Sequence, residues 1–299
     1  IDGDGDLDAV VGEGFGTLKY YNNTEVPVTP SYTEQTGTAN PFNGIDVGSY
    51  STPTLADIDG DGDLDAVVGV NDGTLKYYKN TGTATNPVYT EQTGTANPFD
   101  GIDVGSYSTP TLADIDGDGD LDAVVGVNDG TLKYYKNTGT ATNPVYTEQT
   151  GTANPFNGID VGSSSKPTFA DIDGDGDLDA VVGVNGGTLK YYQNTGTATN
   201  PSYTEQTGTA NPFNGIDVGG TYSTPTFADI DGDGDLDAVV GVNDGTLKYF
   251  TANRTPTDLA LSSTTFAENQ IIGTVIGNFT TTDPDTGNTF TYSLSKSAR

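Results

Sequence analysis

Residues 57–65 read Asp-Ile-Asp-Gly-Asp-Gly-Asp-Leu-Asp. The same nine residues begin again at positions 114, 171 and 229, and a copy that lacks only the first aspartate opens the chain at Ile1. Successive isoleucines of this motif are separated by 57, 57, 57 and 58 residues. A fixed period of this length is typical of a small structural unit that has been copied in tandem. The fold therefore has to be explained one repeat at a time.

Neighbouring repeats are almost identical. Residues 57–113 and 114–170 differ at only four pairs of positions, which are Asp100/Asn157, Tyr107/Ser164, Thr109/Lys166 and Leu112/Phe169. A catalytic centre is a unique arrangement of side chains, so we do not expect one inside units that repeat this closely. The repeats are predicted to bind or to support rather than to catalyse.

Short runs of β-forming residues flank the Asp-rich motif. Residues 52–56 form a short strand that leads into it, with Pro53 near the start, where a missing N–H is tolerated. Residues 66–70 are a continuous apolar run that is too short for a helix and rich in valine, which predicts a strand buried on both faces. The Asn-Asp-Gly sequence at 71–73 then supplies residues that favour the tight turn of a hairpin.

Two further strands complete the repeat. Residues 74–78 are the returning strand, with Leu75 and Tyr77 on one face, and residues 88–91 are a weaker fourth strand. No segment shows a helical period of 3.6 residues. An ordered loop over 97–102 leads to the next repeat.

Four antiparallel strands with one nearly all-apolar strand near the middle are typical of a propeller blade. A β-helix would need much shorter coils, and a row of separate sandwiches would need about 100 residues per unit. The fold class is therefore predicted as all-β, with about 4.5 four-stranded propeller repeats in residues 1–252. Ring closure is left open between lost upstream repeats, a five-bladed ring and a partner.

Alternate positions of the motif carry carboxylates that can converge on one cation. In residues 57–65, aspartates occupy positions 1, 3, 5, 7 and 9, and Gly62 at position 6 permits a sharp turn. Ca²⁺ takes six to eight hard oxygen ligands, whereas Mg²⁺ demands a strict octahedron and keeps its waters, so Ca²⁺ is the better fit. An EF-hand is excluded because its position 12 requires Glu, where this chain has Val68, and because the flanking segments are strands.

Composition limits the function classes. The chain has 42 acidic and 11 basic residues and a formal charge of −31, which repels nucleic acid and anionic membranes and attracts cations. Cysteine and histidine are absent, which removes disulfides, a thiol nucleophile, the commonest general base and the usual zinc ligand. No run approaches the roughly 18 apolar residues of a membrane span. Because the chain begins at Ile1 inside a motif, we expect anchoring and export signals to lie in sequence beyond it.

The repeat resembles the FG-GAP/VCBS repeat of bacterial surface proteins, which is related to the calcium-binding blades of integrin α-subunit propellers. The resemblance covers roughly residues 1–251 and rests on Thr-Pro-Thr-Leu-Ala before the motif, and on Val-Val-Gly, Gly-Thr-Leu-Lys-Tyr-Tyr and Asn-Thr-Gly after it. It implies Ca²⁺ in the loop between the first two strands of a blade, with the aspartate at position 7 contributing its backbone carbonyl. Family propellers usually have seven blades, and this chain departs from that number. The ligands implied are Asp2, Asp4, Asp6 and Asp8 in the incomplete first copy, Asp57, Asp59, Asp61, Asp63 and Asp65 in the second, Asp114, Asp116, Asp118, Asp120 and Asp122 in the third, Asp171, Asp173, Asp175, Asp177 and Asp179 in the fourth, and Asp229, Asp231, Asp233, Asp235 and Asp237 in the fifth.

A second domain is predicted over residues 253–299, where the repeat stops. This stretch resembles the first half of a cadherin-like β-sandwich, a family that binds calcium at domain junctions with the Glu of Glu-Asn and an Asp-x-Asp pair. By position that role would fall to Glu268, Asp283 and Asp285. The other reading is a partial set of strands with acidic turns.

The leading functional hypothesis is a secreted or cell-surface adhesion or scaffold module that is not an enzyme and in which Ca²⁺ makes the blades rigid. Its partners would be calcium and a cell-surface protein or glycan. One alternative is a lectin-like propeller with a sugar site at each blade interface, where Tyr77, Tyr78, Tyr89 and Tyr107 would stack on sugars. A second alternative is a calcium-dependent polysaccharide lyase, which would need Lys, Arg or Tyr as its base because histidine is absent.

Overall fold

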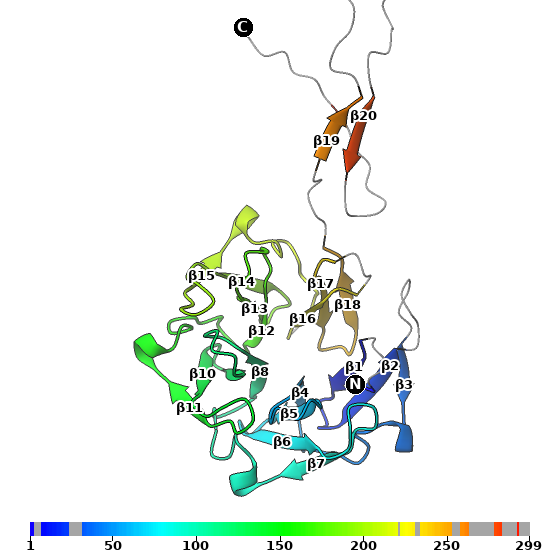
Figure 1. Ribbon diagram of the computed structural model, residues 1–299, viewed down its shortest axis with the longest axis vertical. Helices are drawn as coiled ribbons and strands as arrows, with labels where there is room; N and C mark the ends of the chain where they lie inside the picture. The colour runs from blue at the N-terminus through cyan, green and yellow to red at the C-terminus, as the bar shows by residue number, and fades with distance from the viewer. Residues whose placement is uncertain are drawn as a thin grey trace, which may run out of the picture.

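The chain folds into five antiparallel β-sheets set around a common axis, with a separate hairpin outside the ring (Figure 1). The computed structural model describes residues 1–2, 7–23, 32–220, 222–230, 234–252, 258–262, 278–282 and 292. Each sheet is one blade and corresponds to one sequence repeat. The prediction of an all-β propeller is therefore confirmed, and the number of blades is five.

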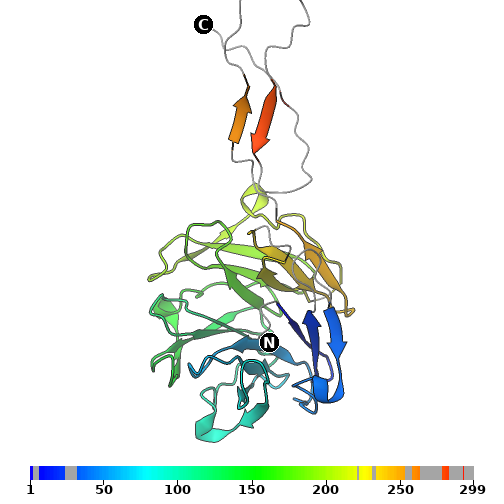
Figure 2. The ribbon, with the colours of Figure 1, turned by 45° about the vertical axis from the view of Figure 1, so that its right-hand side comes forward.

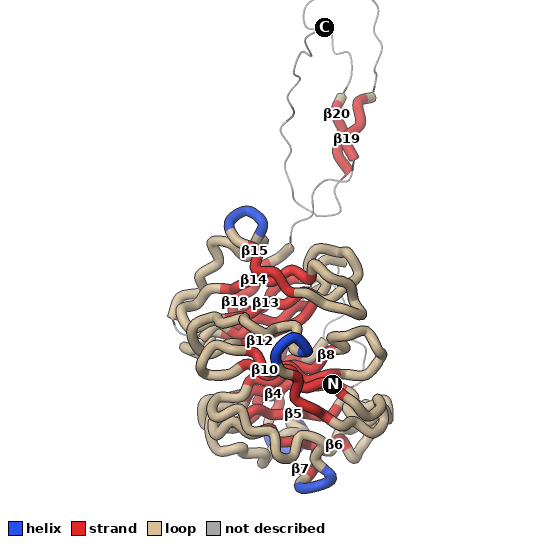
Figure 3. The backbone as a smooth tube through the Cα atoms, turned by 90° about the vertical axis from the view of Figure 1, so that its left-hand side faces the viewer, coloured by secondary structure: helices blue, strands red, loops and turns tan. Residues whose placement is uncertain are grey.

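The strands follow one another in blade order. The first blade holds β1 (Ala9–Gly12), β2 (Leu18–Asn23) and β3 (Tyr32–Gln35); the second holds β4 (Thr52–Ala56), β5 (Asp65–Gly69), β6 (Leu75–Asn80) and β7 (Tyr89–Gln92); the third holds β8 (Thr109–Ala113), β9 (Asp122–Gly126), β10 (Leu132–Asn137) and β11 (Tyr146–Gln149). The fourth holds β12 (Lys166–Ala170), β13 (Asp179–Gly183), β14 (Leu189–Asn194) and β15 (Tyr203–Gln206), and the fifth holds β16 (Thr224–Ala228), β17 (Asp237–Gly241) and β18 (Leu247–Phe250). Among the described residues, the only helical segments are single 3₁₀ turns at Gly37–Ala39, Gly94–Ala96, Gly151–Ala153 and Gly208–Ala210 (Figure 3).

Within a complete blade the sheet order equals the chain order, from β4 to β7 in the second blade. The first strands of successive blades contact one another, because β4 contacts β8, β8 contacts β12 and β12 contacts β16. These strands therefore surround the propeller axis, and the fourth strands lie at the rim (Figures 1 and 2). The expected strand limits are correct to within two residues.

In the second, third and fourth blades the second strand is buried on both faces, as its apolar run predicts. In β5, Ala66, Val67 and Val68 are fully buried. Val67 packs with Leu75 and Tyr77 toward the third blade, whereas Ala66 and Val68 pack toward the first blade. Adjacent strand residues point to opposite faces, so an uninterrupted apolar run serves two blade interfaces at once.

The loop between blades anchors the next blade with an aromatic side chain. Phe99 is 1% exposed, and its ring stacks on Tyr146 of the third blade with ring centroids 4.4 Å apart. Phe42 stacks on Tyr89 of the second blade in the same geometry. The Phe of the Asn-Pro-Phe sequence in each repeat is thus a packing residue that joins consecutive blades.

Glycine in the Val-Val-Gly sequence is required by a close approach of two blades. A Cβ added at Gly69 would lie 2.1 Å from the backbone oxygen of Ser108 in the third blade. Any side chain at position 69 would push the two blades apart.

The outer face of the fifth blade is not covered as the others are. Leu247 and Tyr249 are 58% and 47% exposed, whereas the equivalent Leu75 and Tyr77 of the second blade are each 3% exposed. The four hydrophobic clusters found in the described residues each join two consecutive blades, from first-to-second to fourth-to-fifth. Packing in the described structure is therefore strongest across those four interfaces.

A two-stranded sheet follows the propeller. It pairs β19 (Asp258–Leu261) with β20 (Phe279–Thr282) in antiparallel fashion. The sandwich expected over 253–299 remains a prediction, because the three acidic residues assigned to it, Glu268, Asp283 and Asp285, lie outside the described residues.

Candidate metal centres

In the second to fifth blades the Asp-rich motif lies between the first and second strands, and in the first blade it precedes β1. In the second blade it joins β4 to β5, at the end of the innermost strand. Gly60 and Gly62 adopt φ of +70° and +91°, a left-handed conformation that favours glycine. The expected role of the glycine at position 6 is confirmed, and Gly60 has the same role.

Aspartate side chains fold the loop back on itself. The two carboxylate oxygens of Asp57 accept hydrogen bonds from the backbone N–H groups of Asp61 at 3.1 Å and Gly62 at 3.0 Å. The carboxylate of Asp61 accepts the N–H of Asp63 at 3.1 Å. Short side chains bonded to nearby backbone N–H groups are typical of tight turns, and here they hold the carboxylates on the inside of the curve.

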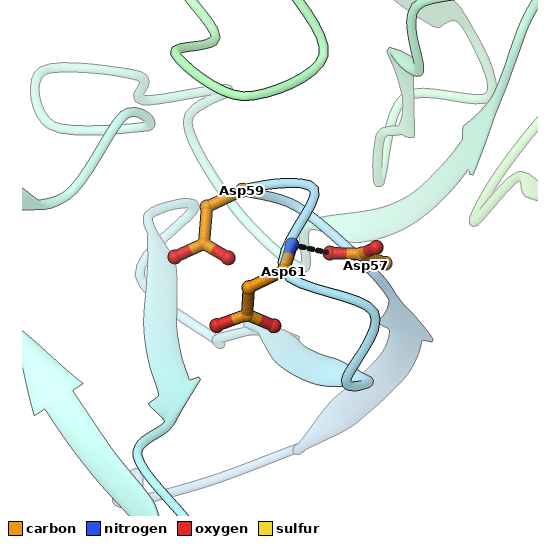
Figure 4. A group of neighbouring side chains, drawn as sticks. All are labelled: Asp57, Asp59 and Asp61. Atoms are coloured by element: carbon orange, nitrogen blue, oxygen red, sulfur yellow. Dashed lines mark hydrogen bonds between the residues drawn. The ribbon is translucent and has the colours of Figure 1, made fainter. Parts of the chain in front are cut away.

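In three blades the loop brings three carboxylates together. Each contributes one oxygen, and these oxygens lie within 4.8 Å of one another. Figure 4 shows the group of the second blade, with the side chains of Asp59 and Asp61 next to each other and the carboxylate of Asp57 bonded to the backbone N–H of Asp61. The three groups are Asp57, Asp59 and Asp61; Asp114, Asp116 and Asp122; and Asp171, Asp173 and Asp179. A cation among such oxygens would offset their mutual repulsion.

One carboxylate oxygen in each of these loops is buried without a hydrogen-bond donor. The atoms are Oδ1 of Asp59, Oδ1 of Asp116 and Oδ1 of Asp177. A buried charged oxygen that lacks a partner is costly, and native structures rarely leave one unsatisfied. The donor set therefore fits a hard cation, which would supply the missing contact.

The last aspartate of the motif also has a structural task. Asp65 is fully buried at the start of β5, where it accepts the hydroxyl of Tyr77 at 2.7 Å and the backbone N–H of Asn80 at 2.7 Å. Its oxygen Oδ2 also accepts the N–H of Ile58 at 3.3 Å. This carboxylate therefore ties the loop to the second and third strands of its own blade.

Burial raises the pKa of the last aspartate of the motif in the second, third and fourth blades. Burial is the largest influence on the pKa of Asp65, Asp122 and Asp179 and raises all three, and it raises that of Asp122 to about 6. A raised pKa means that the charged form is disfavoured where it lies. A bound cation nearby would relieve that cost, as Asp122 and Asp179 belong to the converging groups.

The predicted ligands are not all brought together equally. Among the described residues, Asp63, Asp118, Asp120, Asp175 and Asp177 do not join a converging group, and neither does Asp65. In the first and fifth copies, Asp4, Asp6, Asp231 and Asp233 lie outside the described residues. The described parts of those copies keep the same structural bond. Asp8 accepts the hydroxyl of Tyr20 and Asp237 accepts that of Tyr249, both at 2.9 Å. Asp2, Asp229 and Asp235 are the other described aspartates of these two copies.

A lysine also reaches this site, which the motif by itself did not indicate. The ammonium of Lys79 pairs with the carboxylates of Asp59 and Asp61, and Lys136 pairs in the same way with Asp116 and Asp118. A signal was present, because Lys79 lies two residues after Tyr77 on the same strand and so on the same face, and Tyr77 bonds Asp65 of the loop.

The fourth blade carries Gln193 in place of that lysine, and its amide donates to Asp173 at 2.6 Å. Desolvation, followed by the neighbouring carboxylates of the loop, raises the pKa of Asp177 there. The fourth loop thus has less internal compensation for its negative charge than the second and third.

We expect Lys136→Gln to tighten Ca²⁺ binding at the third loop by about fivefold, because the ion no longer displaces an ammonium whose exposed pair is worth at most about 1 kcal/mol. The reverse substitution, Gln193→Lys, should weaken the fourth site similarly. Both effects are measured by Ca²⁺ titration against a chromophoric chelator. Lys133→Gln is the matched control, because Lys133 pairs with Glu148 at 3.1 Å and not with the loop. Shifts of both test variants in the same direction would contradict the assignment.

In two blades the Asp-rich loop contacts the next blade. A Cβ added at Gly60 would lie 2.7 Å from Cγ2 of Thr142, which belongs to the turn before β11 of the third blade. Gly117 approaches Ala198 and Thr199 of the fourth blade in the same way. An ion bound in the loop would therefore lie close to a blade interface.

Most of the tyrosines considered as sugar platforms are packing residues. Tyr77 and Tyr78 are buried, at 3% and 4% exposure, and Tyr89 stacks on Phe42. Only Tyr107 among them remains outside the blade interfaces. The arrangement does not favour one sugar site at every interface.

Comparison with known families gives a direct match. The model of the family described as FG-GAP-like repeat matches residues 57–125, 114–182 and 171–240, which together span more than half of the chain. No curated protein matches the chain.

One similar solved structure is a lectin from Agrocybe aegerita, described by its specific recognition of non-reducing terminal N-acetylglucosamine. It is 19% identical, the alignment covers 81% of this chain and 62% of that one, and the TM-score is 0.43. The chain thus spans about six tenths of the length of this relative. In the part of the chain that the structure describes, no helix is long and apolar enough to cross a membrane.

Proposed function

Because the chain belongs to the family of FG-GAP-like repeats, we propose that it is a Ca²⁺-binding β-propeller that serves as an adhesion or scaffold module outside the cell. It acts by binding rather than by catalysis. Ca²⁺ held in the Asp-rich loops stiffens the blades, and the stiffened ring presents a surface to a partner.

The observation that carries this proposal is the buried carboxylate oxygen without a donor in the second, third and fourth loops, next to converging carboxylates. Such an oxygen calls for a cation, and a set made only of carboxylate and carbonyl oxygens suits Ca²⁺. Mg²⁺ would require a stricter octahedron and would keep more of its water.

The position of the loops explains why an ion would stabilise the ring. The loops of the second and third blades connect the innermost strand to the buried second strand and touch the next blade near Thr142 and Thr199. One ion therefore restrains three elements. A site that binds 100-fold below the ambient Ca²⁺ concentration adds about 2.7 kcal/mol to the free energy of unfolding.

The need for Ca²⁺ supports an extracellular setting. Ca²⁺ is abundant outside cells, and a chain without cysteine cannot use disulfides to stabilise small blades. The formal charge of −31 favours a protein or glycan partner over nucleic acid or an anionic membrane.

Substitution of Asp116 by Asn should remove one Ca²⁺ from the stoichiometry measured by isothermal titration. Asp116 lies in the converging group of the third loop and carries its unsatisfied oxygen. The wild-type chain should bind at least three ions, one for each converging group. An unchanged stoichiometry in Asp116→Asn would contradict the assignment of the site.

The repeats provide the control for this experiment. Asp100→Asn removes a carboxylate outside the loops, and the next repeat has Asn157 at the equivalent position, so this variant should bind as many ions as wild type. The adhesive role is tested with the same proteins on beads, whose attachment to cells should be lost in chelator. Attachment that persists in chelator would contradict a calcium-stiffened adhesive surface.

A further inference from the structure

Four equivalent residues, each two positions before an innermost strand, have a strained backbone. Tyr50, Tyr107, Ser164 and Tyr222 adopt φ of 53°, 52°, 53° and 69°. A bulky residue with positive φ is an outlier that persists only where its surroundings enforce it. The strain therefore points to a conformation that the fold maintains.

Hydrogen bonds between blades enforce this conformation. The N–H of Tyr107 donates to the backbone oxygen of Asn71 at 3.2 Å. The next residue, Ser108, is 1% exposed, and its hydroxyl accepts the N–H of Val70 at 2.8 Å and donates to the backbone oxygen of Thr74 at 2.7 Å. The turn of the second blade thus holds the residue that precedes β8 in place.

The tyrosines gather near the propeller axis. The rings of Tyr50 and Tyr107 meet edge to face with centroids 5.0 Å apart. Tyr222 occupies the equivalent position two residues before β16, and desolvation, followed by the phenols of Tyr50 and Tyr222, raises the pKa of Tyr107. Tyr50 is 47% exposed, which leaves aromatic surface open to solvent.

The member of this set in the fourth blade is not a tyrosine. Ser164 stands where the other blades have tyrosine, and it is 5% exposed and donates to Asn128 at 3.1 Å. Two residues later, Lys166 replaces the threonine found in the neighbouring blades. One bulky ring has therefore been removed and one cation introduced at the same end of the axis.

The Lys166 ammonium is largely buried, and no carboxylate of the described residues pairs with it. It donates to the hydroxyl of Thr109 on the neighbouring innermost strand at 3.0 Å. Burial lowers the pKa of Lys166 to about 8. Within the described part of the chain, the lysines that form ion pairs belong to third strands, and Lys166 is not among them.

The surrounding sequence has also lost negative charge. The hairpin turn of the second and third blades carries Asp72 and Asp129, but the fourth blade has Gly186 at that position. This turn lies beside Ser164, because the N–H of Asn185 donates to the backbone oxygen of Ser163, the residue before it, at 3.4 Å. Three changes in otherwise near-identical repeats thus make this location more positive and remove one aromatic ring from it.

We propose that this axial site, formed by Tyr50, Tyr107, Tyr222 and Lys166, binds an acidic sugar. The sugar carboxylate pairs with the Lys166 ammonium, and the pyranose ring lies against the tyrosine rings. An ammonium with two unused donors needs an anion, and aromatic rings bind the apolar face of a sugar.

The axial site is separate from the metal loops. It lies at the start of the innermost strands, whereas the Asp-rich loops follow the ends of the same strands. A five-residue strand is about 16 Å long at 3.3 Å per residue, which exceeds the screening length of about 8 Å in physiological salt. The repulsion of an anionic ligand by the loops is therefore strongly reduced at the axial site.

The test compares three ligands on the full chain in a calcium-containing buffer, by ligand-observed NMR. Glucuronate has both the carboxylate and the ring, glucose has the ring alone, and acetate has the carboxylate alone. Glucuronate should bind about tenfold or more tightly than either of the others, since a hydrogen bond to a charged group is worth about 1.5–3 kcal/mol.

Two variants restore residues that other blades already carry, so the fold should tolerate them. Lys166→Thr should reduce glucuronate binding to the level of glucose, and Ser164→Tyr should weaken all sugar binding by placing another ring two residues before Lys166. Lys190→Thr, which removes a lysine paired with Glu205 on the rim-side strands, should bind glucuronate like wild type. Asp116→Asn should also bind glucuronate like wild type. This variant tests the alternative that Ca²⁺ in the third Asp-rich loop, and not Lys166, holds the sugar carboxylate.

Several outcomes overturn the proposal. Equal affinity for glucuronate and glucose removes the role of the ammonium, and equal affinity for glucuronate and acetate removes the role of the rings. Unchanged glucuronate binding by Lys166→Thr, or a loss in Asp116→Asn, moves the ligand away from the axis. The absence of saturation at millimolar glucuronate rejects the site.

Discussion

Addition of Ca²⁺ to the chelated protein is expected to raise its midpoint of thermal unfolding by about 15 °C or more. Three described loops bring carboxylates together, and each would contribute about 2.7 kcal/mol at a Ca²⁺ concentration 100-fold above its dissociation constant. For a chain of this size, each kcal/mol moves the midpoint by about 2–4 °C. The effect is large because an unfolded chain cannot place these carboxylates around one ion.

Calorimetry of matched samples measures this shift. One sample contains Ca²⁺, one contains chelator, and a third contains Mg²⁺ at the same concentration, all at equal ionic strength so that simple screening is held constant. Mg²⁺ should produce a much smaller shift. The triple variant Asp59→Asn, Asp116→Asn, Asp173→Asn should fold but lose most of the response, because it alters all three converging groups. An unchanged midpoint in Ca²⁺ and chelator would sink the proposal that Ca²⁺ stiffens the blades.

Replacement of Asp122 by Ala should lower the free energy of unfolding by about 4 kcal/mol even in the presence of chelator. Asp122 is fully buried and accepts the hydroxyl of Tyr134 at 2.8 Å and the N–H of Asn137 at 2.7 Å, as well as the N–H of Ile115. The substitution strands these donors inside the blade. Chemical denaturation with chelator in excess measures the loss.

A neighbouring carboxylate provides the contrast. Asp116→Ala should change stability in chelator by no more than about 1 kcal/mol, because its interaction with Lys136 is a partly exposed ion pair. In Ca²⁺ the same variant should lose the contribution of its site. If Asp116→Ala proved the more destabilising of the two in chelator, the division between a structural and a metal-binding carboxylate would be wrong.

The Asp-rich motif predicts the shape of the loop but not the structural role of its last aspartate. Alternating aspartates and the glycine at position 6 predicted a curled loop with converging oxygens, and Gly62 and the group of Asp57, Asp59 and Asp61 confirm it. The structural bond of Asp65 to Tyr77 was not predicted, because it joins residues on two strands whose register depends on the folded sheet.

Strand positions were predictable for a simple reason. The apolar run of residues 66–70 has no polar alternative, so it can only be buried, and tight turns on either side limit its length. That Val67 faces the following blade while Val68 faces the preceding one was decided by the ring, since both faces of a blade look equally apolar in the sequence.

By itself, the sequence determined the repeat, the four-stranded blade and the acidic loop, because these depend on residues that are neighbours along the chain. Tertiary structure alone decided that the ring has five blades, that Lys79 and Lys136 enter the Asp-rich loops, that the rings of Tyr50 and Tyr107 meet, and that Lys166 reaches Thr109 of the neighbouring innermost strand. Those groups are one repeat or more apart at the axis, and about twenty residues apart at the loops. Their proximity arises only when blades pack around a common centre, and local sequence patterns carry no information about the angle between neighbouring blades.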